Sequence, residues 1–111
     1  MPDFKKDITK ALNGLDTQIV EMVGEFIKRR RKHYEEAAAK LHQELKVDVA
    51  RYGEMLLEGN ITKEEFEMLV KSRTGLLKIQ IQEEIAVSKA KFEEIAIEVA
   101  KLAIKAVILL L

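Results

Sequence analysis

The sequence predicts an all-α fold, a long antiparallel helical hairpin that assembles with further copies into a four-helix or larger bundle. Three observations predict it: proline occurs once, at position 2; apolar residues recur every three or four positions; and helix stop and start signals stand together near the midpoint. A chain of 111 residues has room for one domain. We therefore expect a single helical hairpin domain over residues 1–111.

The first half of the chain is predicted to form one helix over about residues 3–58, because proline is absent after position 2. An alternative is a break near residues 13–14, where Asn13 and Gly14 could end a short first helix. An unbroken helix would cost about 1 kcal/mol at this glycine. The apolar residues that set the helical period are Phe4, Ile8, Ala11, Leu15, Ile19, Met22 and Phe26.

The turn is predicted at residues 59–61, between the two halves. Gly59 suits the left-handed residue that follows a helix end. Thr62 and Glu65 have the spacing of a capping box, in which each side chain binds a backbone N–H of the new helix. Ile61 and Phe66 have the spacing of a hydrophobic staple across the same cap. A phosphate-binding loop is disfavoured because no further glycines accompany Gly59.

The second half is predicted to form one helix over about residues 63–110, with a bend at Gly75 as the alternative. Residues 77–82 alternate like a strand, but nothing else in the chain alternates to pair with them. In a hairpin turning near residue 60, facing residues have numbers that sum to about 120. This register places a polar seam where the two helices meet. Its members are Arg30, His33, Glu84 and Ser88.

The C-terminal segment predicts a partner. Residues 95–111 contain only three polar residues, Glu98, Lys101 and Lys105, which form one narrow stripe. One neighbouring helix covers a stripe of about 100°, so a two-helix hairpin leaves aliphatic surface exposed. We expect a second copy of the chain to cover that surface. The predicted oligomer interface comprises Ile95, Ile97, Val99, Leu102, Ile104, Ala106, Ile108 and Leu109.

Three functions follow from these features. The first is a non-enzymatic, self-assembling scaffold or adaptor protein that forms a homo-oligomer, with a different protein at the C-terminal helix as a further option. The second is a membrane-associated protein that uses residues 95–111, although that run is short and carries charges. The third is a nucleic-acid accessory protein that uses the basic run 28–33. The third is disfavoured because consecutive positions of a helix spread around its circumference.

The residues give little support for catalysis or for a bound cofactor. There is no cysteine, which excludes a disulfide, a thiolate metal site and a cysteine nucleophile. His33 and His42 are nine residues apart and so lie on opposite sides of a helix. The adjacent glutamate pairs diverge on a helix and form no catalytic dyad. We expect no catalytic residue, no metal and no cofactor, and, since no secretory signal is recognisable, a cytoplasmic protein.

Overall fold

The computed structural model describes residues 3–111, which form five α-helices and contain no β-strand. The predicted all-α fold is therefore confirmed. Five helices replace the two that we expected. They are α1 (Phe4–Asn13), α2 (Asp16–Phe26), α3 (Arg31–Leu57), α4 (Lys63–Glu84) and α5 (Lys89–Ile108).

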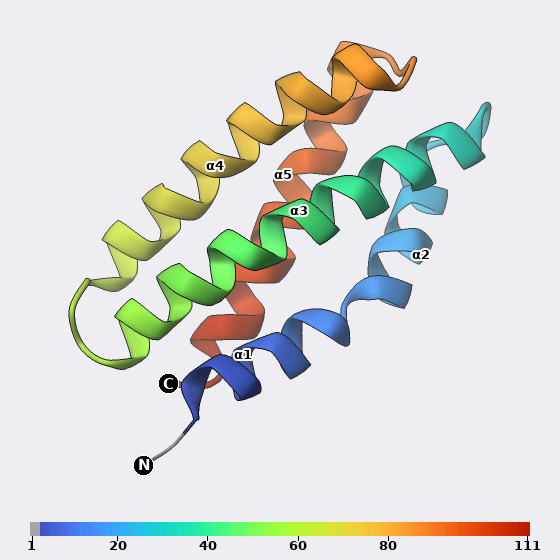
Figure 1. The fold of residues 1–111 in the computed structure, drawn as a ribbon. Helices are drawn as coiled ribbons and strands as arrows, with labels where there is room; N and C mark the ends of the chain where they lie inside the picture. The colour runs from blue at the N-terminus through green and yellow to red at the C-terminus, as the bar shows by residue number, and fades with distance from the viewer. Residues whose placement is uncertain (1–2) are drawn as a thin grey trace.

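The long helix α3 lies at the centre and contacts all four other helices (Figure 1). On one side α4 and α5 form a second antiparallel pair, and on the other α1 and α2 follow one another as a kinked arm that packs on α3 and α5. The result is a four-helix bundle made by one chain, with principal extents of 47 × 23 × 19 Å. The α2–α3 and α4–α5 loops lie at one end, and the α3–α4 turn lies at the other.

The α3–α4 turn has the predicted conformation. Gly59 takes a φ of 82°, which a residue with a Cβ adopts only under strain. The backbone N–H of Thr62 donates to the Glu65 side chain over 2.9 Å, and the N–H of Glu65 donates to the Thr62 hydroxyl over 3.1 Å. Phe66 is fully buried, and Ile61 packs against the same core. The predicted cap and turn residues are therefore confirmed.

The predicted hairpin register is also close to the observed one. Asp48 of α3 pairs with Arg73 of α4 over 2.7 Å. Nearer the other end, Lys40 of α3 pairs with Glu84 of α4. In both pairs the two residue numbers sum to slightly more than the predicted 120, as expected for an antiparallel hairpin that turns near residue 60.

The predicted continuity of the two helices is wrong. The first half is broken between α1 and α2, as the alternative at Asn13 and Gly14 anticipates, and again at residues 27–30. The second half is broken at residues 85–88. The alternative bend at Gly75 is absent, because Gly75 lies inside α4.

Neither unexpected break contains a glycine or proline, so their cause is tertiary packing. Ile27 and Ile85 leave the helical conformation for an extended one, each immediately after a helix. Ile27 thereby stays buried in the core while the chain reverses direction. These reversals bring α1, α2, α3 and α4 around α5, so one chain supplies the neighbours that we expected from other copies.

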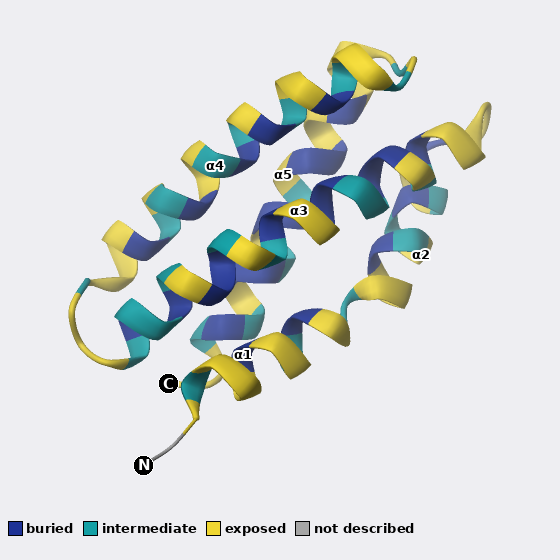
Figure 2. Cartoon of the chain, in the orientation of Figure 1, coloured by how far each residue is buried: buried dark blue, intermediate teal, exposed yellow. Residues whose placement is uncertain are grey.

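The core runs the full length of the bundle between α3 and its neighbours, and the outward faces of the helices are exposed (Figure 2). Phe66 near the α3–α4 turn and Phe92 near the opposite end are both fully buried. Gly53 lets α3 approach two other helices closely, because a Cβ there would lie 2.9 Å from Ile8 and 3.2 Å from Val107.

Candidate functional site

The aliphatic C-terminal segment is part of the core of the single chain. Ile95, Val99 and Ile104, which we predicted in an oligomer interface, are buried within this chain. They cannot contact a second copy while the bundle is intact, so this part of the prediction is wrong. The remaining predicted interface residues reach the surface to different extents: Ile97 and Leu109 are exposed, while Leu102, Ala106 and Ile108 are half-buried.

Two of the four predicted polar-seam residues, Glu84 and Ser88, contact α3, but their partners on α3 are not the predicted ones. Arg30 and His33 are exposed and take no part in these contacts. Instead the phenol oxygen of Tyr34 accepts a hydrogen bond of 2.9 Å from the backbone N–H of Ser88, while Lys40 pairs with Glu84. The first turns of α3 are therefore fastened to the end of α4 and to the α4–α5 loop at one end of the bundle.

The basic run forms an exposed loop and the first turn of α3. Residues 28–33 are all exposed, and the loop projects from the end of the bundle (Figure 1). Arg30 has a φ of 56°, in the left-handed region that non-glycine residues seldom occupy. The objection that a helix would spread these charges around its circumference therefore fails. The fold gathers them at one place.

Arg31 differs from its neighbours because it is tied to the bundle. Its Nε donates to Glu35 over 2.6 Å. Its guanidinium lies across α2 at Gly24, where a Cβ would come within 2.5 Å of the group. Arg31 thus fixes the loop against α2. The loop cations for which residues 3–111 offer no ion-pair partner are Lys28, Arg29, Arg30 and Lys32.

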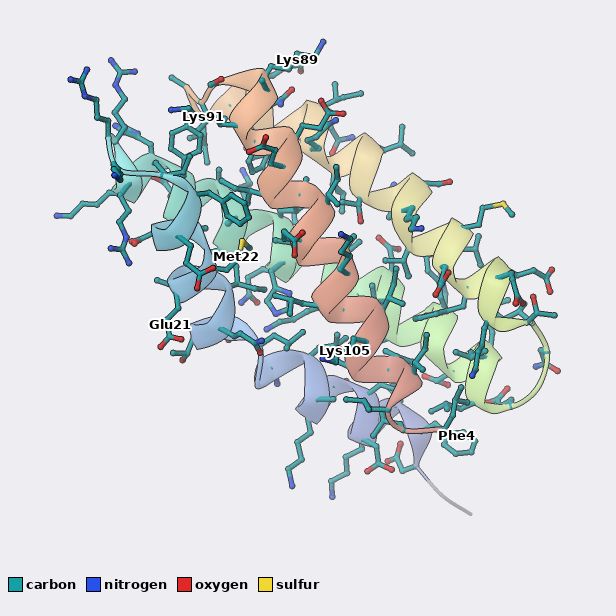
Figure 3. All side chains as sticks on the ribbon, turned by 180° about the vertical axis from the view of Figure 1, so that it is seen from behind. Phe4, Glu21, Met22, Lys89, Lys91 and Lys105 are labelled. Carbon is teal, nitrogen blue, oxygen red and sulfur yellow. The ribbon has the colours of Figure 1, made fainter. Side chains whose placement is uncertain are left out.

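The N-terminus of α5 adds two more cations at the same end. Lys89 and Lys91 lie in its first turn, and both are exposed (Figure 3). The hydrogen bond between Tyr34 and Ser88 holds this helix start beside the start of α3. We call the surface formed by Lys28, Arg29, Arg30, Lys32, His33, Lys89 and Lys91 the basic end.

The helix termini add to the positive potential of the basic end. Neither α3 nor α5 has a side-chain N-cap hydrogen bond, and neither carries an acidic residue in its first turn. The N-terminus of a helix holds a partial positive charge and unpaired backbone N–H groups. Cations placed there raise the local potential further, where proteins usually place acidic residues. Such a surface attracts anions.

A second polar cluster joins α1 and α2 to α3. His42 is 2% exposed, and its Nε2 lies 2.9 Å from the carbonyl oxygen of Leu12 and 3.1 Å from the carboxylate of Asp16. Both groups are acceptors, so Nε2 carries the proton. Lys46, one turn further along α3, donates to Asn13 over 2.8 Å and lies 3.2 Å from Asp16. The cluster satisfies the polar groups at the α1–α2 joint.

Burial lowers the pKa of His42 below its ordinary value, and the charge of Lys46 lowers it further. The Leu12 carbonyl and Asp16 act in the opposite direction but do not outweigh burial. His42 is thus neutral at pH 7. The sequence does not predict this role for His42. Its partners, Leu12 and Asp16, reach it only because the chain reverses direction at residues 27–30, a break that the sequence does not predict.

Within residues 3–111, no group of three or more histidine or acidic side chains is arranged to hold a metal ion. In the same part of the chain, no helix is long and apolar enough to cross a membrane. Comparison with protein-family models, curated proteins and solved structures yields no match.

Proposed function

We propose that this protein is a non-enzymatic nucleic-acid-binding protein that holds the phosphate backbone at its basic end. The observation that carries the proposal is the exposed basic run 28–33, which lies in a loop and a first helix turn at one end of the bundle. Phosphate oxygens release counterions when such cations neutralise them, and this release drives sequence-independent binding.

The chemistry of the basic end favours a phosphodiester polymer over a lipid surface. Proteins that lie in a membrane interface insert apolar or aromatic side chains beside their cations. The run 28–33 contains no apolar residue, and Phe26, the nearest exposed one, precedes it on α2. Phosphate groups need only cations and backbone N–H donors, both of which the basic end supplies.

The proposed binding is independent of base sequence. Proteins that read single strands stack bases on exposed aromatic side chains. Tyr34 is the aromatic residue nearest to the basic run, and it is buried with its hydroxyl engaged by Ser88. Phe26, the exposed aromatic residue next to the run, ends α2 and lies outside the loop. The loop itself therefore offers charge and helix N-termini but no aromatic residue. A cytoplasmic location is part of the proposal, since nucleic acid is present there.

Fluorescence anisotropy with a labelled duplex and a labelled single strand, each at several salt concentrations, tests the proposal. We expect dissociation constants on the order of 10⁻⁶ to 10⁻⁴ M near physiological salt, and a logarithm of affinity that falls linearly with the logarithm of salt concentration. Replacing Lys28, Arg29 and Lys32 together by Gln should weaken binding at least about tenfold and lower the salt slope by about 3.

The matched control replaces three exposed lysines of α1, Lys5, Lys6 and Lys10, by Gln. This variant loses the same net charge far from the basic end, so its affinity should stay close to that of the wild type. Equal losses in the two variants would show non-specific attraction and contradict the assignment. Binding to anionic vesicles without binding to either nucleic acid would replace the proposal by a lipid-surface function.

Self-association, the scaffold function that the sequence suggests, remains a separate proposal. The buried C-terminal segment no longer supports it, because Ile95, Val99 and Ile104 lie in the core of the single chain. A different surface, on α4 and α5, now supports self-association.

A further inference from the structure

The helix α4 is apolar on two sides. Phe66, Val70 and Leu77 face the core, but Met68, Leu76 and Ile79 are also large apolar residues and are 63%, 56% and 53% exposed. The outward face of α4 has no neighbouring helix (Figure 2), and the exposure of these three residues places them on it. Ser72 and Gly75 lie between them on that face, so it carries no charge from Met68 to Ile79 except at its edges.

A groove of about 250 Å³ lies directly beside this face, between α4 and α5. Gly75, Ala96 and Ala100 form part of its apolar lining, and Ile97, which is 49% exposed, stands on its α5 side. The groove is open because Gly75 has no side chain, and no atom lies within 4 Å of the position where its Cβ would be. A large apolar side chain from outside could enter here.

Leu76, which projects from α4, and the groove lie on opposite sides of the outward face. Gly75 lines the groove on the α5 side. Leu76 lies three residues after Arg73, which pairs with Asp48 of α3, so Leu76 stands on the α3 side. A two-fold axis parallel to α4 brings the α3 side of one copy against the α5 side of the other. A two-fold axis perpendicular to α4 would bring Leu76 of one copy against Leu76 of the other instead.

We propose that a second copy of this chain docks on α4 and α5 by a two-fold axis parallel to α4, with Leu76 of each copy in the groove of the other. Such an interface is self-complementary, as a two-fold dimer requires. It differs from the interface predicted at residues 95–111, because Ile97 is the exposed residue of that segment at the groove, while Ala96 and Ala100 line the groove from buried positions.

The charges at the two edges of the face fit the same arrangement. Lys71 and Lys78 line the groove on the α5 side, together with Glu93 of α5, which lies 3.6 Å from Lys78. Glu83, seven residues after Leu76, stands on the α3 side, where Leu76 also lies. The parallel axis brings the groove lysines of each copy, Lys71 and Lys78, to the side on which Glu83 of the other copy lies. The perpendicular axis would place Lys71 beside Lys78 of the second copy, and two like charges would repel.

Sedimentation equilibrium over about 10 μM to about 1 mM protein tests the proposal. The exposed apolar side chains are few, so we expect a weak dimer with a dissociation constant on the order of 100 μM. Leu76→Glu should raise that constant at least about tenfold. Gly75→Leu should do the same by filling the groove, and the fold should stay intact because a Cβ at this position meets no neighbouring atom.

The matched control is Val47→Glu, which adds the same charge at an apolar side chain that is 73% exposed on α3. It should leave the dissociation constant unchanged. A chain that stays monomeric at about 1 mM overturns the proposal. A dimer that survives both Gly75→Leu and Leu76→Glu, or that Val47→Glu abolishes, shows that copies associate elsewhere and also overturns it.

Single cysteines define the symmetry, since the natural chain has none. With the axis parallel to α4, Ile79→Cys faces its own counterpart and should form a disulfide dimer under mild oxidation, and so should Met68→Cys. With the perpendicular axis, neither variant should crosslink alone, but a mixture of Ile79→Cys and Ser72→Cys should, because residues 72 and 79 lie at nearly equal distances on either side of Leu76. That second pattern would overturn the proposed docking geometry.

Discussion

At the α3–α4 turn a glycine, Gly59, takes the left-handed backbone conformation, whereas at the opposite end of the bundle an arginine, Arg30, takes it. At the turn, Thr62 caps α4, and acidic residues occupy its first turn. At the basic end, α3 and α5 start without a side-chain cap hydrogen bond and with cations in their first turns. The N-terminus of α4 therefore has the cap and the acidic residues that helices usually have there, whereas the N-termini of α3 and α5 have neither.

This difference separates stability from function within one fold. A capping box and an acidic first turn stabilise a helix, while cations at its N-terminus oppose the helix dipole. Sequences keep unfavourable local choices mainly where they serve a function. We propose that the basic end is such a place, kept for an anionic partner at a cost in stability.

The comparison requires that both ends share one well-packed core. Phe66→Ala near the turn and Phe92→Ala near the basic end should each lower the free energy of unfolding by about 3 to 5 kcal/mol, because both rings are fully buried. Chemical denaturation measures both losses. A loss below about 1 kcal/mol at Phe92 alone would mean that the basic end is loosely packed and that its unusual caps reflect disorder.

The joint between α1 and α2 should make stability depend on pH. Since the pKa of His42 is lower in the folded chain than in the unfolded chain, the unfolded chain takes up the proton first as the pH falls. The free energy of unfolding should therefore decrease as the pH drops through about 6.5. Thermal denaturation between pH 5 and pH 8 measures this slope, and His42→Leu should reduce it. A wild-type stability that rises on acidification through this range would contradict the assignment.

Substitutions at the two residues with left-handed backbone conformation, Gly59 and Arg30, test the comparison further. Gly59→Ala should destabilise the chain by about 1 kcal/mol, because alanine resists a φ of 82°. Arg30→Gly should stabilise it by about 0.5 to 1 kcal/mol by relieving the same strain, and should weaken nucleic-acid binding by removing a cation. Denaturation and anisotropy on the same samples separate the two effects. An Arg30→Gly variant that is less stable than the wild type would show that the arginine side chain holds the loop.

The smallest effect concerns the first turn of α5. Lys89→Glu places an acidic residue near the helix N-terminus, so it should raise the free energy of unfolding by about 0.3 to 1 kcal/mol. The same change should weaken nucleic-acid binding more than Lys89→Gln does. If Lys89→Glu lowers stability instead, Lys89 has a stabilising partner, and its charge does not destabilise the N-terminus of α5.

Strong local signals explain which parts of the fold the sequence predicts well. Gly59, Thr62 and Glu65 specify their turn through backbone conformation and hydrogen bonds among near neighbours, which need no knowledge of the rest of the chain. The break between α1 and α2 has a weaker signal in Asn13 and Gly14. The sequence also favours helix continuity through Gly75, and the glycine lies inside α4.

The breaks at residues 27–30 and 85–88 have no such signal, because Ile27 and Ile85 are ordinary helix residues that tertiary packing makes extended. One clue was present: cations four residues apart, such as Lys28 and Lys32, repel one another on a helix. Missing these breaks led to the wrong partner for residues 95–111, since two straight helices cannot cover a surface that five helices cover. For the same reason the sequence does not predict that the basic run is gathered in a loop at one end of the bundle.

Nuclear magnetic resonance tests most directly the claim that the basic end binds phosphate. In a titration of ¹⁵N-labelled protein with a short DNA duplex, the backbone amides of residues 29–32 and 89–91 should shift progressively, and the shifts should vanish at high salt. The capped amides of Thr62 and Glu65 should stay in place. Shifts confined to other surfaces, or no shifts at low salt and millimolar duplex, would contradict the account.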